Sequence, residues 1–188
     1  MNSHHVSTKK TPLSIKDMTI TALMTAVTCI LGPLAIPMHF SPVPISFTNL
    51  ALYLMVYVLN RRCSFLSYTL YFLLGAAGLP VFSGFSGGLG RIVGPTGGYL
   101  IGFFFQILIS GFIVERWNKK RIPEIIGLVL GTITSYIFGT LWLAKQLEIS
   151  FAAGLSVGVL PYLPGDGAKI ALAAIIAPKL RRAIEKNA

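Results

Sequence analysis

The stretch GGYLIGFFFQILISGFIV, residues 97–114, contains no charged side chain. A bilayer core is about 30 Å thick and an α-helix rises about 1.5 Å per residue, so about 17 to 25 apolar residues cross it. The turn that follows, ERWNKKR at residues 115–121, carries five charged side chains. An uncharged run of this length that ends in a charged turn predicts a membrane-spanning helix.

Similar apolar runs lie on both sides of this stretch. They are residues 18–37, 45–59, 63–79, 125–143 and 149–178. The last run would be about 45 Å long as one helix, so we expect it to break at Pro161 and Pro164. The sequence therefore predicts an all-α polytopic membrane protein, with a six-transmembrane-helix bundle in residues 18–188 behind a cytoplasmic N-terminal tail in residues 1–17.

The composition also favours a membrane protein. Hydrophobic residues make up 54% of the chain and charged residues 12%, whereas a soluble domain averages about 25% charged residues. The chain thus has too little polar surface to cover itself in water. Its net charge of +10 comes from short basic clusters between the apolar runs, not from one basic face, so we expect no nucleic-acid partner.

The distribution of lysine and arginine predicts the orientation in the membrane. With the N-terminus inside, thirteen of the 16 basic residues fall in cytoplasmic segments, Arg91 and Lys145 fall outside, and Lys169 lies within the membrane. Both termini are therefore expected in the cytoplasm. Cys29 and Cys63 have no other ligand at metal spacing, so we expect two unpaired thiols and no metal site.

Asp166 and Lys169 are the charged residues within the last apolar run. A charged side chain inside a membrane costs roughly 2.5–3.5 kcal/mol on insertion scales, which makes such residues functional candidates. Three positions apart, the two share a helix face and can neutralise each other. They form either a self-satisfied ion pair that stabilises the helix break, or a ligand site in the outer half of the membrane.

A glycine-rich segment, FSGFSGGLGRIVGPTGGY at residues 82–99, is predicted to reach the same outer face. Within it, Arg91 can hold a carboxylate and Tyr99 offers an aromatic face with a hydroxyl at its tip. Irregular backbone is tolerated at membrane depth only where protein buries it or where it lines a cavity. The alternative is an ordinary exposed loop with Arg91 at the lipid headgroups.

The segment SPVPISFTN, residues 41–49, is also expected on the outer side. Its prolines restrict the backbone, and Ser46, Thr48 and Asn49 supply neutral hydrogen-bonding groups. Together with the glycine-rich segment and the charged pair, it predicts a pocket that opens outward. The expected ligand is a small molecule with a polar head and a partly apolar body.

Ala22 and Ala26, in TALMTAVT, form a small-xxx-small stripe that lets another helix approach closely. We predict a partner interface at this stripe. Routine packing inside the chain is the alternative.

Several enzyme motifs are absent from the sequence. There is no G-x-x-x-x-G-K-[ST] phosphate loop, so the chain itself is not expected to hydrolyse ATP. There is also no H-E-x-x-H and no pair of aspartates within the apolar runs, which leaves an intramembrane hydrolase without candidate machinery. We expect no enzymatic activity. Inverted repeats would favour a channel or secondary transporter that works alone, and we find none.

Three segments resemble one known family. GPTGGYLIGF at residues 94–103, SPVPISFTNL at residues 41–50 and LPYLPGDGAK at residues 160–169 are similar to BioY proteins, the biotin-binding S components of energy-coupling factor (ECF) transporters. The resemblance runs in order through essentially the whole chain after residue 18. Thr48 departs from the pattern, because family members commonly carry glutamine there.

The resemblance implies a six-helix protein that captures biotin from outside and presents it for import, without a cofactor. Asp166 and Lys169 would contact biotin. Ala22 and Ala26 would contact the transmembrane T protein, and two ATPase subunits would supply the energy. The expected location is the bacterial cell (inner) membrane, and a homodimer is left open. That Arg91 binds the valerate carboxylate of biotin is our own hypothesis. The alternatives are an S component for another small vitamin and a solitary small-solute channel or secondary transporter.

Overall fold

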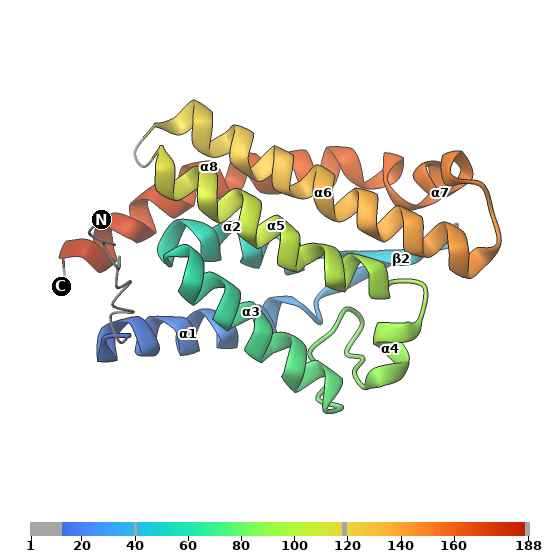
Figure 1. Cartoon of the computed structure of the whole chain (residues 1–188), viewed down its shortest axis with the longest axis horizontal. Coiled ribbons are helices and arrows are strands. Elements are labelled where there is room, and N and C mark those ends of the chain that lie inside the picture. Colours follow the sequence, from blue (N-terminus) through green and yellow to red (C-terminus); the bar gives the residue numbers. More distant parts are fainter. Residues whose placement is uncertain (1–12, 40, 118–119, 187–188) are drawn as a thin grey trace, which may run out of the picture.

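The structure, a computed structural model, describes residues 13–39, 41–117 and 120–186. It is an elongated bundle of helices with a small two-stranded sheet (Figure 1). In chain order the elements are α1 (Ile15–Leu31), β1 (Ala35–Met38), β2 (Ser41–Ser46), α2 (Thr48–Val58), α3 (Arg61–Ala76), α4 (Leu89–Val93), α5 (Gly97–Arg116), α6 (Arg121–Leu147), α7 (Phe151–Gly158), the 3-10 turn η1 (Leu160–Tyr162) and α8 (Leu163–Lys186). Most of the predicted N-terminal tail, residues 1–12, lies outside the described residues.

Each predicted apolar run contains a helix, but the all-α prediction is wrong in one place. The run at residues 18–37 is helical only as far as Leu31, and β1 then pairs antiparallel with β2. The sequence of β2, SPVPIS, contains two prolines. Proline lacks the N–H that a helix interior requires and favours extended backbone in the residue before it. The proline-rich stretch therefore folds as a hairpin between α1 and α2.

Three helical stretches among the described residues are long and apolar enough to cross a membrane by themselves. They are Gly97–Arg116, Arg121–Leu147 and the stretch Phe151–Ile184. Three other helices contain more than ten residues but are shorter than these stretches, with 17 residues in α1, 11 in α2 and 16 in α3. The described part of the chain thus has the apolar helices of a membrane protein.

The predicted break in the last apolar run is a single 3-10 turn. α7 ends at Gly158, η1 follows, and α8 begins directly after it. Pro161 lies in the 3-10 turn and Pro164 in the first turn of α8, where a missing N–H removes no intrahelical hydrogen bond. Asp166 therefore lies in the first turn of α8.

α5 and α6 lie side by side and pack together more extensively than any other two elements (Figure 1). On α6, small residues recur at every fourth position of the contact: Gly127, Gly131, Ser135 and Gly139. A Cβ added at Gly131 would lie 2.1 Å from Ser110 Oγ and 2.8 Å from the backbone oxygen of Gln106. One added at Gly139 would lie 2.2 Å from the Tyr99 ring. The two helices can approach this closely because no side chain separates them at these positions.

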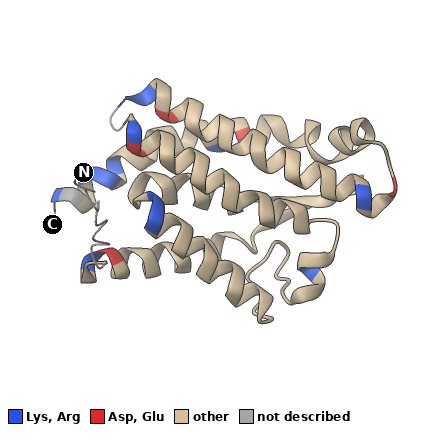
Figure 2. Cartoon of the chain, viewed as in Figure 1, with Lys and Arg blue, Asp and Glu red and all other residues tan. Residues whose placement is uncertain are grey.

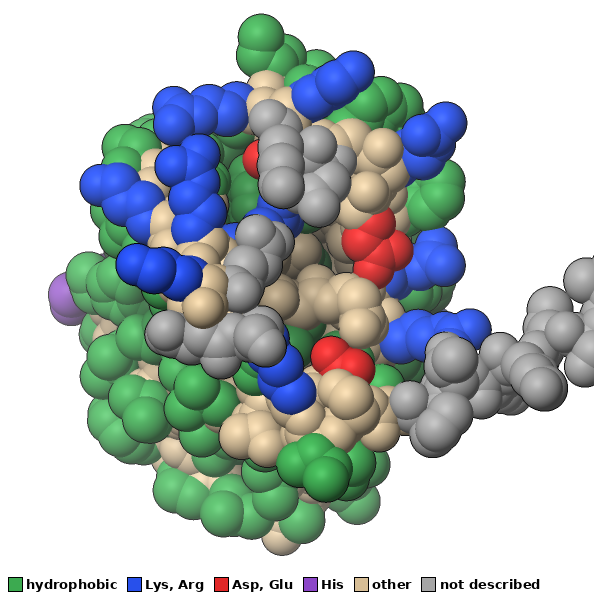
Figure 3. All heavy atoms as spheres, turned by 90° about the vertical axis from the view of Figure 1, so that its left-hand side faces the viewer, with side chains coloured by type: hydrophobic (Ala, Val, Ile, Leu, Met, Phe, Trp, Pro, Cys, Tyr) green, Lys and Arg blue, Asp and Glu red, His purple; other side chains and the backbone are tan. Residues whose placement is uncertain are grey.

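Most of the basic residues lie at the end of the bundle where α1 begins and α8 ends (Figure 2). Seen from that end, their side chains are spread around the rim (Figure 3). Arg181 is one of the thirteen residues predicted to face the cytoplasm, but its guanidinium reaches inward. Its Nη1 lies 3.2 Å from Glu124 Oε1, and its Nε donates to the carbonyl of Tyr57 at 2.6 Å. Because Glu124 is 2% exposed, this ion pair is a buried link between α6 and α8.

We expect the substitution Gly131→Ala to lower the free energy of unfolding by about 1–3 kcal/mol, because the new methyl group must displace Ser110 or the backbone at Gln106. Gly90→Ala is the matched control, since a Cβ at Gly90 meets no atom within 4 Å. Thermal unfolding of both variants in one detergent checks this. An unchanged midpoint for Gly131→Ala would contradict the close contact of α5 and α6.

Candidate ligand-binding site

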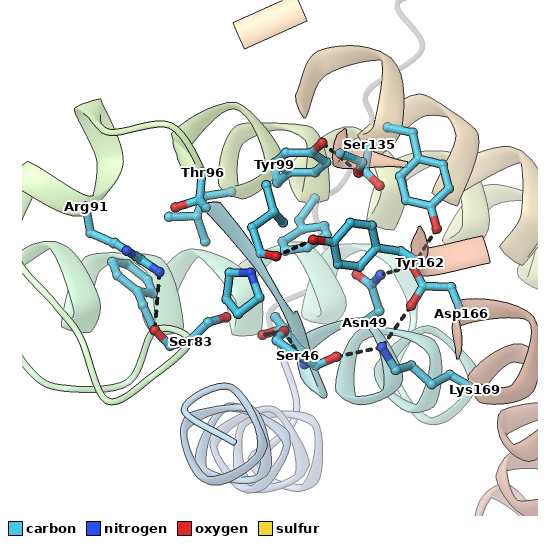
Figure 4. Close-up of a pocket in the computed structure, with 18 residues that line it drawn as sticks. Ser46, Asn49, Ser83, Arg91, Thr96, Tyr99, Ser135, Tyr162, Asp166 and Lys169 are labelled. Atoms are coloured by element: carbon cyan, nitrogen blue, oxygen red, sulfur yellow. Dashed lines mark hydrogen bonds and ion pairs between the residues drawn. The ribbon is translucent and has the colours of Figure 1, made fainter. Parts of the chain in front are cut away.

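A cavity lies between the hairpin, the glycine-rich segment and the start of α8, away from the basic rim. The space between its lining atoms, open mouth included, is about 660 Å³. All seven side chains predicted to bind substrate line it: Ser46, Thr48, Asn49, Arg91, Tyr99, Asp166 and Lys169. The fold thus brings three separate segments together (Figure 4), while the binding role of each residue stays a prediction.

Asp166 and Lys169 form a buried ion pair at one end of the cavity. Lys169 Nζ lies 2.8 Å from Asp166 Oδ1, and the residues are 9% and 5% exposed respectively. Nζ also donates to the backbone carbonyl of Ser46 at 2.7 Å and lies 6.0 Å from the centre of the Phe47 ring. The pair therefore links α8 to the end of the hairpin and does more than neutralise itself.

Two further helices hold the carboxylate of Asp166. Its Oδ2 accepts hydrogen bonds from Asn49 Nδ2 at 3.0 Å and from the Tyr136 hydroxyl at 2.5 Å. A carboxylate has about four acceptor positions, and an ammonium group has three donors. After these contacts, Asp166 keeps one acceptor position and Lys169 keeps one N–H.

Asn49 adds a third unused group to this end of the cavity. Its Oδ1 is buried and has no hydrogen-bond partner among the described residues. A buried oxygen without a partner lowers stability unless a ligand or water satisfies it. The head of a ligand at this end would therefore meet two acceptors and one donor.

The hydroxyls of Ser46 and Thr48 are already engaged with each other. Ser46 Oγ donates to Thr48 Oγ1 at 2.8 Å and accepts from the Thr48 N–H at 3.1 Å. These bonds stabilise the turn from the hairpin into α2. The group that Ser46 directs to Lys169 is its backbone carbonyl, not the side chain that the sequence indicated.

Arg91 lies at the end of the cavity away from Asp166 and Lys169 (Figure 4). It is half-buried, and its Nη2 lies 3.5 Å from the carbonyl of Ser83, a long hydrogen bond. The guanidinium therefore keeps most of its five donors for another partner. Tyr99 donates its hydroxyl to the carbonyl of Gly158 at 2.8 Å, so its ring forms part of the cavity wall while its proton is occupied.

Some lining residues could not be recognised in the sequence. Tyr136 and Ser135 lie within the apolar run at residues 125–143, where both residue types are common in helix packing. Ser135 belongs to the series of small residues at every fourth position of α6 and Tyr136 follows it directly, which is the one signal that could have indicated them. Tyr162, in η1, lies with its hydroxyl 2.8 Å from Ser41 Oγ and so connects the 3-10 turn to the hairpin.

The cavity has a charged group at each end and aromatic side chains between them. A carboxylate and an ammonium at one end suit a neutral head that both donates and accepts hydrogen bonds. A guanidinium at the other end suits an anion. Within the described residues, no three His, Cys, Asp or Glu side chains could hold a metal ion, and Cys29 and Cys63 are free thiols outside the cavity. The arrangement fits a small acid with a polar head.

Ala22 and Ala26 are both exposed on α1. Large apolar side chains of the same helix are exposed with them: Ile15, Met18, Leu23 and Ile30. The buried side of α1 carries Thr25, whose Oγ1 lies 3.0 Å from Ser67 Oγ on α3. Packing inside this chain therefore does not explain the two alanines, and a partner interface stays the prediction.

Comparison with known proteins gives consistent matches over most of the chain. The model of the BioY family matches residues 4–186. A probable biotin transporter BioY of Pyrococcus horikoshii is 35% identical over 169 residues, covering 90% of this chain and 98% of that protein. The biotin transporter BioY2 of Lactococcus lactis subsp. cremoris is 34% identical over 168 residues, covering 89% of this chain and 91% of the relative.

A solved structure has the same arrangement of helices. It is the 2.1 Å crystal structure of the S-component for biotin from an ECF-type ABC transporter. The comparison gives a TM-score of 0.83 at 33% sequence identity, and it covers 89% of this chain and 92% of the other.

We expect Asp166→Asn to destabilise the ligand-free protein by up to about 3–5 kcal/mol, because it leaves the buried ammonium of Lys169 without its counter-charge. The double variant Asp166→Asn/Lys169→Met removes both charges and should recover at least half of that loss. Thermal unfolding without ligand measures the three proteins. A double variant less stable than the single one would show that the pair does not act as a coupled charge.

Proposed function

The chain belongs to the BioY family, and we propose that it captures biotin in this cavity as the substrate-binding S component of an ECF-type ABC transporter. It is a transport protein and not an enzyme. The observation that carries the proposal is the set of unused hydrogen-bonding groups in the cavity, which lies between a buried ion pair at one end and an arginine at the other.

The head of biotin complements the Asp166 end of the cavity. Its ureido ring has two N–H donors and one carbonyl acceptor. The free acceptor position of Asp166 and the unpartnered Oδ1 of Asn49 can receive the two N–H groups, and the free N–H of Lys169 can donate to the carbonyl. All groups left unused in the ligand-free site would then be satisfied.

The tail of biotin complements the Arg91 end. Biotin ends in a valerate chain with a carboxylate, and Arg91 has donors to spare at the opposite end of the cavity from the ion pair (Figure 4). The apolar part of the ligand would lie between these ends, against the rings of Tyr99 and Phe103.

The proposed topology has six membrane spans with both termini in the cytoplasm. In addition to the three stretches that suffice by length, α1, α2 and α3 would each cross with the help of their flanking turns. The basic rim at the end of α8 supports a cytoplasmic position for that end, because lysine and arginine are enriched on the inner side (Figure 2). The proposed location is the bacterial cell (inner) membrane.

The energy for import would come from partner subunits. We expect the T protein to pack on the exposed face of α1 at Ala22 and Ala26, where the small side chains permit close approach of a helix. Two ATPase subunits would complete the module, which agrees with the missing phosphate loop in this chain.

Biotin should stabilise the purified protein against thermal unfolding. A ligand that binds only the folded state raises the free energy of unfolding by about 2.7 kcal/mol when its concentration is 100 times Kd.

Arg91→Gln should weaken binding of biotin about tenfold or more, since hydrogen bonds to charged groups contribute about 1.5–3 kcal/mol. Biotin amide, which lacks the tail charge, should bind the wild type and Arg91→Gln equally. Isothermal titration with both ligands measures this.

Lys145→Gln is the control for this experiment, because it removes one positive charge from the same side of the protein outside the cavity. If biotin produced no stabilisation, the biotin assignment would fail and other vitamins would be the next ligands to screen. If Arg91→Gln weakened both ligands alike, the carboxylate contact would be wrong while the head-group site would stand.

The substitution Ala26→Trp should abolish co-purification with the T protein and leave the Kd for biotin unchanged, because Ala26 is exposed on α1 and does not line the cavity. Leu141→Trp is the control, since Leu141 is an exposed apolar residue of α6, a helix that lies across the bundle from α1 (Figure 1). Retention of the complex by Ala26→Trp would contradict the proposed interface.

A further inference from the structure

A second hollow, separate from the cavity, lies between α5 and the first half of α6 near the basic rim. The space between its lining atoms, open side included, is about 1180 Å³. Its lining is apolar apart from one arginine: Arg61, Leu108, Ile109, Phe112, Ile113, Trp117, Pro123, Ile126 and Leu130. We call it the α5–α6 groove.

The groove has the length of one leaflet. On α5 it extends from Leu108 to Trp117, nine residues, or about 13 Å along the helix axis. This is close to half of a hydrocarbon core of about 30 Å. Leu108, Phe112 and Ile126 are exposed large apolar residues along this length. Trp117 lies at the rim end, and indole rings favour the boundary between acyl chains and headgroups. An acyl chain of the inner leaflet would fit this length and polarity.

Arg61 places a positive charge at the rim end of the groove. Its guanidinium carbon lies 5.6 Å from the centre of the Phe112 ring, and the guanidinium makes no hydrogen bond or ion pair with any described residue. The carboxylate of Glu115 contacts Arg61, but it accepts a hydrogen bond from the backbone N–H of that residue and not from its guanidinium. The side-chain charge of Arg61 is therefore not neutralised by this carboxylate bond.

Further basic residues lie near Arg61. Arg62 follows it at the start of α3, where the carboxylate of Glu115 binds the backbone N–H of Arg61 and not its guanidinium. Arg116 and Arg121, the last residue of α5 and the first of α6, add further positive charge at this end of the bundle. The charge beside the groove is complementary to a phosphate group.

We propose that the α5–α6 groove binds one anionic phospholipid of the inner leaflet, with an acyl chain along the groove and the phosphate at the guanidinium of Arg61. The site lies on a different face from the ligand cavity and is independent of which vitamin that cavity holds. It requires only that the basic rim faces the inner leaflet. The lipid would tie the start of α3 to the α5–α6 pair.

Trp117 provides a direct probe of this lipid. The chain has two tryptophans, so Trp142→Phe leaves Trp117 as the sole fluorophore. This protein is placed in phosphatidylcholine vesicles with the same fraction of either phosphatidylglycerol or phosphatidylcholine carrying brominated acyl chains, which quench tryptophan on contact. We expect brominated phosphatidylglycerol to occupy the groove about fivefold more strongly, the factor that corresponds to roughly 1 kcal/mol per basic residue at an anionic surface.

Two variants distinguish this site from the general charge of the rim. Arg61→Gln should abolish the preference for phosphatidylglycerol, whereas Arg62→Gln, the same change one residue along and outside the groove, should retain it. Ile126→Phe narrows the groove but leaves every charge in place, and it should also abolish the preference. It keeps the test decisive if Arg61→Gln does not fold.

Three outcomes would overturn the proposal. Equal quenching by the two brominated lipids in the parent protein would leave the groove to a partner helix or a second copy of the chain. Equal loss in Arg61→Gln and Arg62→Gln would reduce the effect to the overall charge of the rim. An unchanged preference in Ile126→Phe would show that no acyl chain lies in the groove.

Discussion

The close approach of α5 and α6 is the constraint on which the cavity depends. Inside a membrane, helices gain little from the hydrophobic effect, so their association rests on packing and hydrogen bonds. The missing side chain at Gly139 admits the Tyr99 ring, and that at Gly98 admits Trp142. Trp142 Nε1 in turn donates to the carbonyl of Gly94 at 2.9 Å, which holds the glycine-rich segment against α6. The close contact of α5 and α6 therefore positions two walls of the ligand cavity.

α8 contributes a buried ion pair near each of its ends. Asp166 and Lys169 pair with each other at the cavity, and Arg181 pairs with Glu124 of α6 near the basic rim. The twelve residues from Lys169 to Arg181 correspond to about 18 Å of helix, most of the hydrocarbon thickness. Both pairs also bond to backbone carbonyls of other elements, at Ser46 and at Tyr57. Charged groups thus fix the position of α8 along its axis, relative to its neighbours, at two points.

Local chemistry allowed much of this fold and site to be predicted from the sequence. The uncharged runs located the long helices, Pro161 marked the 3-10 turn, and the spacing of Asp166 and Lys169 indicated their ion pair. The remaining features depend on contacts between distant parts of the chain. Tyr136 bonds to Asp166 across 30 residues, and neither the pairing of the hairpin strands nor its extended backbone follows from hydropathy. The sequence did not indicate that glycines bring α5 and α6 close together, because a glycine in an apolar run changes neither its charge nor its hydropathy pattern.

The link between Lys169 and Ser46 uses a main-chain carbonyl, and that group is the same in every amino acid. Evolution can therefore exchange the residue at position 46 and keep the link, as long as the strand follows the same path. A different residue at position 46 is then weak information about a change of ligand. Proteins that keep the same ligand should instead keep Asp166 and Lys169 on α8. These residues act through their side chains, which no main-chain group can replace.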